Sequence, residues 1–190
     1  MEVSRNVSKS ILASLALFIL PATAVYAERD MNKILKGTYA QNEQWTCNNS
    51  YTPFQLNCPD CWTTQSTAAG KITYNGDGTA HSEGRYSYTN HTAVDVDLGT
   101  YSCEWIYTVN EDRSFSTEGN CTVSSLTKDQ PPAIFTNQKW YGQISKWNKN
   151  ILVERHDAEI EGISIDGGVT NVIDSMCGKT GAQTKLRRQN

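Results

Sequence analysis

The stretch TYSCEWIYTVNEDRSFSTEGNCTV, residues 100–123, alternates between apolar and polar side chains on both sides of a polar loop. Strict alternation of this kind predicts half-buried β-strands, and two such runs around a short polar loop predict a β-hairpin. Folding the stretch about Asp112 places the apolar partners on one face, whereas a shift of one residue would turn one arm's apolar set towards solvent. The predicted cross-strand pairs are Val109 with Phe115, Tyr107 with Thr117, Trp105 with Gly119, Cys103 with Cys121 and Tyr101 with Val123.

Short strand-like segments continue on both sides of this hairpin. An Asn75-Gly76-Asp77-Gly78 turn predicts a second hairpin, because these residues tolerate the positive φ of tight turns. Helical periodicity is confined to Glu28–Lys36, a short helix ended by Gly37. The other predicted strands are residues 71–74, 79–88, 93–98, 99–109, 114–124, 134–135, 139–146, 151–154, 160–165 and 169–173. The sequence therefore predicts an all-β fold, an antiparallel up-and-down barrel of about eight to ten strands with a short N-terminal helix, with a β-sandwich as the alternative.

Residues 1–27 have the features of a secretory signal peptide. Arg5 and Lys9 precede an apolar run at residues 10–20, and Val25-Tyr26-Ala27 supplies small residues for a cleavage site. The run is too short to span a bilayer, and no later run is long enough. We therefore expect cleavage before Glu28, no membrane span, a single disulfide-stapled barrel domain at residues 28–190, and a periplasmic or extracellular location.

All six cysteines lie after residue 27, where an oxidising compartment favours disulfides. The hairpin register pairs two of them directly. The Cys-Pro-Asp-Cys motif lies in a polar loop with no buried strand before it and no amphipathic helix after it, which favours a structural bond over a redox-active pair or a metal site. The remaining pair would join the first strand to the last. The predicted bridges are Cys103–Cys121, Cys58–Cys61 and Cys47–Cys177.

The charge balance gives no sign of a nucleic-acid partner. Seventeen Lys and Arg residues against 20 Asp and Glu residues give a formal net charge of −3, with no local basic patch. The three histidines, His81, His91 and His156, lie far apart and lack metal-ligand spacing. We expect no metal and no cofactor, and the sequence defines no oligomeric state.

One pair of carboxylates has the spacing of a catalytic site. Asp95 and Asp97 share one face of a predicted strand, as the paired carboxylates of glycoside hydrolases can. Because Val94, Val96 and Leu98 take the other face, we interpret the aspartates as a solvent-exposed stripe rather than a catalytic pair. No catalytic residue is predicted.

Several short motifs resemble those of a known group of proteins. They are residues 35–40 (LKGTYA) followed by Cys47, residues 70–79 (GKITYNGDGT), residues 107–109 (YTV), residues 141–145 (YGQIS), and Met176-Cys177 before a basic C-terminal strand. They are similar to small exported bacterial lipocalin-like (calycin-type) β-barrel proteins of unknown function. In lipocalins a Gly-x-Trp motif opens the first strand, and an arginine from the end of the barrel covers the tryptophan ring. The resemblance implies that Gly37 and Tyr39 take the Gly-x-Trp positions and that Arg187 or Arg188 covers the ring.

Three functions from different classes fit these observations. The first is a non-enzymatic barrel that binds a small apolar or amphipathic ligand, with Tyr101, Trp105, Tyr107, Val109 and Phe115 lining the site; the alternative for these residues is that they fill the core. The second is a protein-binding module, such as an inhibitor or an envelope interaction protein, anchored by exposed aromatics at Trp45, Trp62, Trp140-Tyr141 or Trp147. The third is a thiol–disulfide enzyme that uses Cys58 and Cys61.

Overall fold

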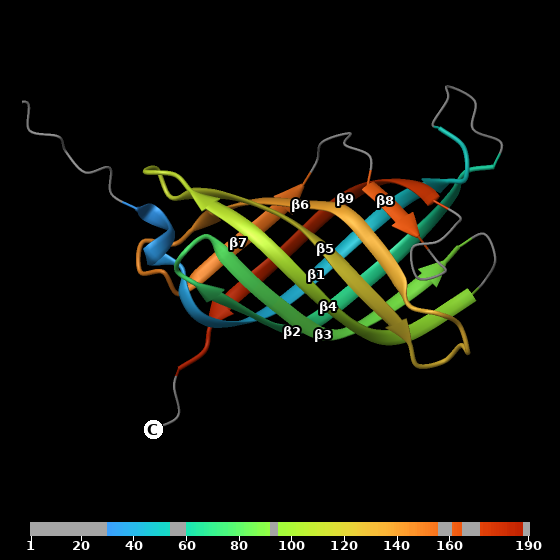
Figure 1. Ribbon diagram of the computed structural model, residues 1–190, viewed down its shortest axis with the longest axis horizontal. Coiled ribbons are helices and arrows are strands. Elements are labelled where there is room, and N and C mark those ends of the chain that lie inside the picture. The colour runs from blue at the N-terminus through green and yellow to red at the C-terminus, as the bar shows by residue number, and fades with distance from the viewer. Residues whose placement is uncertain (1–29, 54–59, 92–94, 156–160, 165–171, 188–190) are drawn as a thin grey trace, which may run out of the picture.

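The computed structural model describes residues 30–53, 60–91, 95–155, 161–164 and 172–187, and it is almost entirely β-structure (Figure 1). The predicted signal peptide lies outside the described residues. The elements are η1 (Met31–Ile34), β1 (Lys36–Ser50), β2 (Trp62–Asn75), β3 (Thr79–Asn90), β4 (Asp95–Val109), β5 (Ser114–Ser125), β6 (Ala133–Ile144), β7 (Asn150–Arg155), β8 (Glu161–Ser164) and β9 (Val172–Lys185).

The strands form a closed antiparallel barrel, so the barrel prediction is confirmed and the sandwich alternative is wrong. Each strand from β1 to β6 pairs with the next, β7 pairs with β9, and β9 returns to pair with β1. Nine strands fill eight positions around the wall, because β7 and β8 share the position between β6 and β9. β7 pairs with one end of β6 at Tyr141–Ile144, and β8 pairs with the other end at Ile134–Thr136.

The predicted hairpin at residues 100–123 is confirmed in register. All five predicted pairs, from Val109 with Phe115 to Tyr101 with Val123, are opposite each other in β4 and β5. Trp105 covers Gly119 as expected, since a Cβ atom on that glycine would lie 2.6 Å from the indole ring. The turn at residues 75–78 is also confirmed, with φ of +85° at Gly76 and +95° at Gly78.

Two predicted segments of β6 are joined by an irregularity. Residues 134–135 and 139–144 belong to one strand, which ends two residues before the predicted end at 146, and the register to β5 shifts between Gly119 and Cys121. Asn137, with φ of +57°, lies at this point of β6. A bulge re-aims the side chains that follow it, so Phe135 on one side and Gln138 on the other both line the barrel interior.

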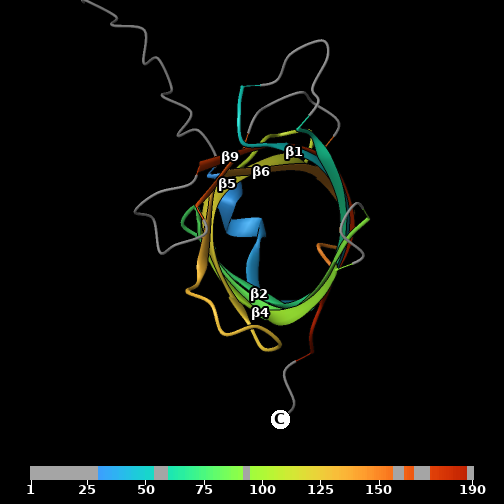
Figure 2. The ribbon, with the colours of Figure 1, turned by 90° about the vertical axis from the view of Figure 1, so that its right-hand side faces the viewer.

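The predicted N-terminal helix is observed only as the single 3-10 turn η1. This turn lies across one end of the barrel (Figure 2). Asp30 caps this turn by accepting a hydrogen bond from the backbone N–H of Asn32 at 3.1 Å. Leu35, which is fully buried, follows the turn and enters the barrel. The chain then bends into β1 at Gly37, whose φ of +119° is a conformation that residues with a Cβ rarely adopt.

We call the end that carries η1 the closed end, because large side chains fill it. Three tyrosine rings stack edge to face, with ring centroids 5.5 Å apart for Tyr39 and Tyr74 and 5.0 Å apart for Tyr74 and Tyr107. The Tyr107 hydroxyl donates to the Leu35 carbonyl at 2.9 Å and accepts from the Gly76 amide at 3.0 Å, which fixes η1 to the β2–β3 turn. Aliphatic and aromatic side chains complete this core: Val109, Phe115, Ile144, Ile151 and Val153.

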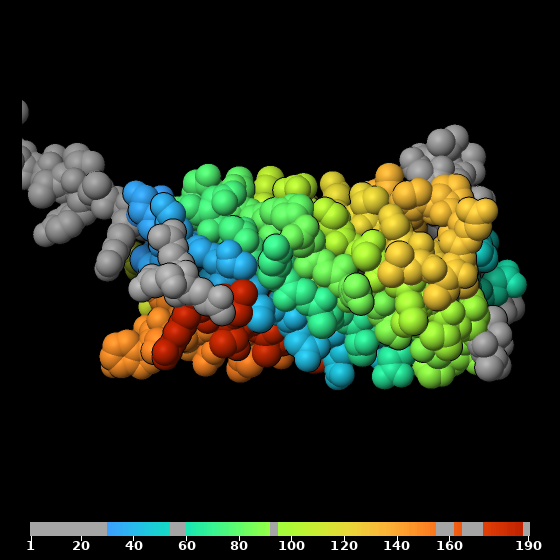
Figure 3. Space-filling view, turned by 90° about the horizontal axis from the view of Figure 1, so that it is seen from below, coloured from blue at the N-terminus to red at the C-terminus, as the bar shows by residue number. Residues whose placement is uncertain are grey.

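Within the described residues, the cation beside the first-strand aromatic ring is a lysine, where the resemblance implies Arg187 or Arg188. Lys185 of β9 places its ammonium 5.5 Å from the Tyr39 ring centroid, and its side chain also lies beside Gly37. Arg187 is exposed two residues later, and Arg188 lies outside the described residues. Lys185 takes this place because Leu186 is held by a backbone hydrogen bond to Thr38 at 2.9 Å, which leaves Arg187 beyond the last pairing. The start and the end of the described chain therefore meet at the closed end (Figure 3).

Candidate functional site

A cavity of about 310 Å³ occupies the other half of the barrel. It extends to what we call the loop end, where β1, β3 and β5 end and β2, β4 and β6 begin. Small inward residues leave this space: Ser66 and Ala68 on β2, and Ser82 on β3. The aromatic residues of its wall are Trp45, Tyr51, Trp62, Tyr86, Tyr88, Tyr101, Trp105, Phe135 and Trp140.

The aromatic wall is held in place by hydrogen bonds to polar neighbours. The Trp105 indole N–H donates to Ser82 Oγ at 2.8 Å, and the Tyr101 hydroxyl accepts from Gln41 Nε2 at 2.7 Å. Tyr51 and Trp62 contact each other at the loop end, with ring centroids 4.9 Å apart. Tyr101 and Trp105 therefore border the cavity with their rings while their polar atoms are hydrogen-bonded, as is typical of buried Tyr and Trp.

We call the polar group of residues Gln41, Glu43, Gln138 and Lys179 the cavity floor. Gln41 and Glu43 project inwards from β1, and Glu43 lies opposite Gly181 in the register with β9. Lys179 of β9 is buried and donates to Gln138 Oε1 of β6 at 2.7 Å. Its ammonium also lies 5.1 Å from the centroid of the Trp140 ring. The lysine is therefore held against β6 by an amide oxygen and a ring face.

Glu43 has an unusual ionisation for a carboxyl group. Burial raises the pKa of Glu43 to about 7, although the Lys179 ammonium and a hydrogen bond from Gln183 act in the opposite direction. The Gln183 amide is itself oriented by the Tyr74 hydroxyl, which donates to its oxygen at 2.8 Å. Near neutral pH the carboxyl group can thus exchange between its protonated and ionised forms, which is the property that binding and proton-transfer sites commonly share.

The interpretation of Asp95 and Asp97 as a solvent-exposed stripe is wrong. Both line the cavity, and Asp97 is only 5% exposed, whereas Val96 and Leu98 on the opposite face are 55% and 47% exposed. Hydrogen bonds offset the cost of burying the Asp97 carboxylate on the inward face. Burial acts to raise the pKa of Asp97, but donors on Ser125, Thr127 and Tyr86 outweigh it and hold the pKa below its ordinary value.

These contacts also distinguish the two aspartates from a catalytic pair. The Tyr86 hydroxyl donates to one oxygen of Asp97 at 2.8 Å, and Ser125 Oγ and Thr127 Oγ1 donate to the other at 2.5 Å each. Asp95 is paired with the ammonium of Lys128. Both carboxylates are engaged by the wall of the loop end, which gives them a structural role in holding the end of β5 against β4.

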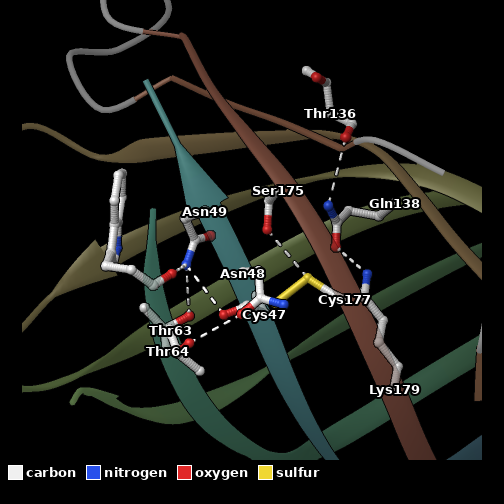
Figure 4. Close-up of a disulfide and its surroundings, with 11 residues drawn as sticks. Cys47, Asn48, Asn49, Thr63, Thr64, Thr136, Gln138, Ser175, Cys177 and Lys179 are labelled. Carbon is white, nitrogen blue, oxygen red and sulfur yellow. Dashed lines mark hydrogen bonds between the residues drawn. A yellow bond between two sulfur atoms is a disulfide. The ribbon is translucent and has the colours of Figure 1, made fainter. Parts of the chain in front are cut away.

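The two disulfides within the described residues both lie in the cavity half. Cys103–Cys121 joins β4 to β5 and Cys47–Cys177 joins β1 to β9, and both bonds confirm the predicted pairing. Around Cys47–Cys177, Asn49 Nδ2 donates to Thr64 Oγ1 at 3.1 Å, and Lys179 follows two residues after Cys177 (Figure 4). Cys61 is disulfide-bonded as well, while its predicted partner Cys58 lies outside the described residues. The disulfides fit an oxidising, exported location.

The residues expected to line a ligand site fall into two groups. Tyr101 and Trp105 border the cavity. Tyr107, Val109 and Phe115, further along the same face, are packed in the closed end. The alternation on β4 and β5 identified the inward face, but it carries no information on where along the barrel the interior is filled.

The aromatic residues expected to anchor a protein partner are divided as well. Trp140 is buried, and Trp45 and Trp62 line the cavity rather than the outer surface. Tyr141 and Trp147 are exposed, at 40% and 73%.

The cavity floor is the part of the site that sequence reasoning missed. A signal was nevertheless present. Once Cys47 and Cys177 are predicted to form a bridge inside the barrel, the period of two in a strand places Trp45, Glu43 and Lys179 on the same interior face. A Glu and a Lys on interior positions of paired strands are rare in a core and mark a site that can bind a polar group.

In the described part of the chain, no three His, Cys, Asp or Glu side chains gather closely enough to hold a metal ion. His81 lies on the outer face, beside Glu104 at 2.6 Å, and His91 is exposed, while His156 lies outside the described residues. In the same described ranges, no helix is long and apolar enough to cross a membrane.

Comparisons with family models, with curated proteins and with solved structures find no match to this chain. The geometry of the cavity therefore carries the functional conclusion.

Proposed function

We propose that this protein is an exported, non-enzymatic, lipocalin-like barrel that binds a small amphipathic ligand in the cavity of its loop half. The observation that carries the proposal is the cavity of about 310 Å³ with an aromatic wall and a polar floor. Pockets of this size, mostly apolar with a few convergent polar groups, are the usual form of small-molecule sites. Eight-stranded barrels leave room for one such ligand.

The distribution of polar groups supports an amphipathic ligand over a purely apolar one. The wall offers ring faces from Trp45, Trp105 and Trp140, while the floor offers Glu43 and Lys179. A hydrocarbon that filled the whole cavity would strip water from the half-buried Glu43 without replacing its hydrogen bonds, which costs free energy. A ligand with one polar end avoids this cost.

The proposal includes a periplasmic or extracellular location and no catalytic step. The signal-like residues 1–27 and the disulfides support export. The two carboxylates with the spacing of a catalytic pair, Asp95 and Asp97, are engaged by Lys128, Tyr86, Ser125 and Thr127. A stable binding pocket requires such fixed walls, whereas a catalytic pair requires at least one group that is open to a substrate.

Titration with N-phenyl-1-naphthylamine, whose fluorescence rises in an apolar site, tests the proposal. We expect saturable binding by the oxidised protein. Ser66 is the cross-strand neighbour of Trp45 on the cavity wall. Ser66→Phe places a ring in the cavity and should weaken dye binding about 10-fold or more. Thr67→Phe, one residue further on β2 and exposed, is the matched control and should bind as the unmodified protein does. Equal binding by the two variants would place the dye on the outer surface and contradict the proposal.

Because Ser66→Phe could disturb folding, Trp45→Ala provides a second measurement. This change enlarges the cavity and removes one ring of its wall, so we expect weaker dye binding with an unchanged far-ultraviolet circular dichroism spectrum. A Trp45→Ala variant that binds the dye as tightly as the unmodified protein would also contradict the proposal.

A further inference from the structure

The floor of the cavity contains a hydrogen-bond acceptor that the protein does not use. Gln41 is 5% exposed and borders the cavity, and its Nε2 donates to the Tyr101 hydroxyl at 2.7 Å. Its other amide atom, Oε1, is buried, and among the described residues no group donates to it. Buried polar atoms without a partner are rare in native proteins, and one that borders a cavity is satisfied when a ligand supplies a donor.

A second acceptor lies on the same face of the same strand. Glu43 follows Gln41 by two residues in β1, which places their Cα atoms about 7 Å apart on the interior face. The Glu43 carboxyl group receives a hydrogen bond from Gln183 and the attraction of Lys179, and these do not offset its loss of water, because its pKa remains raised, at about 7. A cationic donor in the cavity would supply the missing stabilisation.

The Lys179 ammonium contacts β6, on the side of the cavity floor away from Gln41 and Glu43. Its ammonium donates to Gln138 Oε1 and lies against the Trp140 ring, both on β6. Strand β6 lies on the far side of β9 from β1 in the strand order. The acceptors Gln41 and Glu43 therefore lie along β1, and the cation of the floor is held towards β6.

The charge of the whole lining favours the same kind of ligand. Among the described residues, the lining contains three carboxylates, Glu43, Asp95 and Asp97, and two lysines, Lys128 and Lys179. With Asp95 paired to Lys128, the remaining charges are one lysine against two carboxylates. An anionic ligand would meet this excess of negative charge, whereas a cation would reduce it and would also be attracted by the ring faces of the wall.

We infer that the ligand carries a protonated amine on an aromatic or aliphatic body, with the ammonium group donating to the Glu43 carboxylate and to Gln41 Oε1 and the body lying against Trp45 and Trp105. This inference rests on the proposed function and gives it a ligand class. An ammonium group has three donors and no acceptor, which matches a carboxylate beside an unsatisfied amide oxygen. Hydrogen bonds between charged partners are the stronger ones, so the head group makes a large contribution to affinity.

Three probes with the same rings and different head groups test the inference by isothermal titration calorimetry at pH 8. They are 2-(naphthalen-2-yl)ethylamine, 2-(naphthalen-2-yl)ethanol and naphthalen-2-ylacetate. We expect the amine to bind about 10-fold or more tightly than the alcohol and the carboxylate to bind most weakly. Equal binding by all three overturns the head-group inference and leaves the proposed function standing. Absence of binding by all three overturns both.

Glu43→Gln separates the carboxylate from the general shape of the cavity. This change keeps the size of the side chain and removes its charge, so it should weaken amine binding about 10-fold or more and leave alcohol binding within about 2-fold. Unchanged alcohol binding also shows that the variant is folded with its cavity intact. The matched control is Glu118→Gln, an exposed carboxylate on β5, which should change neither affinity. Amine binding that is unchanged in Glu43→Gln overturns the inference.

The pH dependence of amine binding gives an independent readout. The groups that face Glu43 are Lys179 and Gln183 on β9, Tyr74 on β2 and Tyr101 on β4. Burial raises the pKa of both tyrosines further above neutrality, whereas it raises the pKa of Glu43 to about 7. An alkylamine remains protonated between pH 5 and pH 8, while the ionised fraction of Glu43 falls up to about 10-fold per pH unit below its pKa. Amine affinity should therefore fall from pH 8 to pH 6 in the unmodified protein and stay flat in Glu43→Gln. A flat profile in both proteins overturns the assignment of Glu43 as the counter-ion.

Discussion

The two halves of this barrel are stabilised by different means. In the closed half, large side chains such as Tyr74, Tyr107 and Phe115 fill the interior, and within the described residues no cysteine lies there. In the loop half the interior is a cavity, and two disulfides cross its wall, Cys47–Cys177 and Cys103–Cys121. Packing requires a filled interior, whereas a disulfide between neighbouring strands does not. The covalent bonds thus keep the wall together where the cavity leaves space for a ligand.

This difference separates stability from function within one domain. A cavity forfeits the contacts that its lining side chains would otherwise make, and charged groups that are partly or fully removed from water, such as Glu43 and Lys179, cost further free energy. The closed half offsets this cost with dense packing. Substitutions in the two halves should therefore have different effects on stability and on binding.

Removal of the longer disulfide should have the largest effect on stability. Cys47 and Cys177 are 130 residues apart in sequence, against 18 for Cys103 and Cys121. Loop-closure entropy assigns about 5 kcal/mol to the first bond and about 3 kcal/mol to the second. We expect Cys47→Ser with Cys177→Ser to lower the free energy of unfolding in urea more than Cys103→Ser with Cys121→Ser. Equal losses, or the reverse order, would show that closure of β1 onto β9 does not depend on the covalent bond.

Two phenylalanines compare packing in the two halves directly. Phe115 is 2% exposed in the closed half, where its ring occupies the space that a Cβ atom on Gly142 would take. Phe135 is half-buried on the cavity wall. Phe115→Ala should cost about 3 to 5 kcal/mol of unfolding free energy, and Phe135→Ala about 1 kcal/mol. Urea denaturation measures both, and a cost for Phe135→Ala as large as that for Phe115→Ala would contradict the division into a packed half and a hollow half.

The carboxyl group on the cavity floor should make stability depend on pH. The pKa of Glu43 is about 7 in the folded protein and near 4.5 in the unfolded chain, so the folded state binds the proton more tightly. This contribution to stability is fully present below about pH 4.5 and is lost as pH rises through 7, up to about 3 kcal/mol. Unfolding free energies measured from pH 5 to pH 8 should show this loss in the unmodified protein.

Glu43→Gln and Glu118→Gln provide the comparison for that pH profile. The first should flatten the decline between pH 5 and pH 8, and the second, on the outer face, should leave it as it is. A decline that persists unchanged in Glu43→Gln would assign it to another group.

The smallest effect concerns the cation beside Tyr39. Lys185→Met keeps most of the side chain's length and removes the ammonium, which should cost about 0.5 to 1 kcal/mol of unfolding free energy. Arg187→Met should leave the unfolding midpoint unchanged, because Arg187 lies beyond the last paired residue of β9. A larger loss of unfolding free energy for Arg187→Met than for Lys185→Met would indicate that Arg187 covers the Tyr39 ring, as the lipocalin resemblance implies.

The sequence was sufficient to predict the barrel because its strongest signals are local. Alternation over residues 100–123 determines both the inward face and the register of β4 and β5, and the glycine turn at residues 75–78 determines the neighbouring hairpin. The bond between Cys47 and Cys177 could be predicted by elimination once the other four cysteines had partners nearby in sequence. These features need only the period of a strand and the short reach of a turn.

The site could not be predicted in the same way. Its chemistry depends on which residues from different strands lie at the same height along the barrel axis. Alternation alone placed Asp95 and Asp97 outside, since Val96 and Leu98 are the more apolar pair. The structure reverses this assignment because hydrogen-bond donors from β3 (Tyr86), from the end of β5 (Ser125) and from just after β5 (Thr127) satisfy Asp97. These donors lie on other strands or loops, so the alternation within one strand cannot predict that they bind Asp97.

The sequence by itself thus determined the all-β architecture, the inward face of its clearest hairpin and two of its disulfides, since each depends on the period of a strand or on a count of cysteines. Only the tertiary structure decided where the interior is filled and where it is hollow. Filling depends on the summed volume of side chains that eight wall positions contribute at each level, a quantity that no single strand contains. It also decided that Gln41 and Glu43 of the first strand share the cavity floor with Lys179 of the last, because closure of β1 onto β9 brings together residues from opposite ends of the domain.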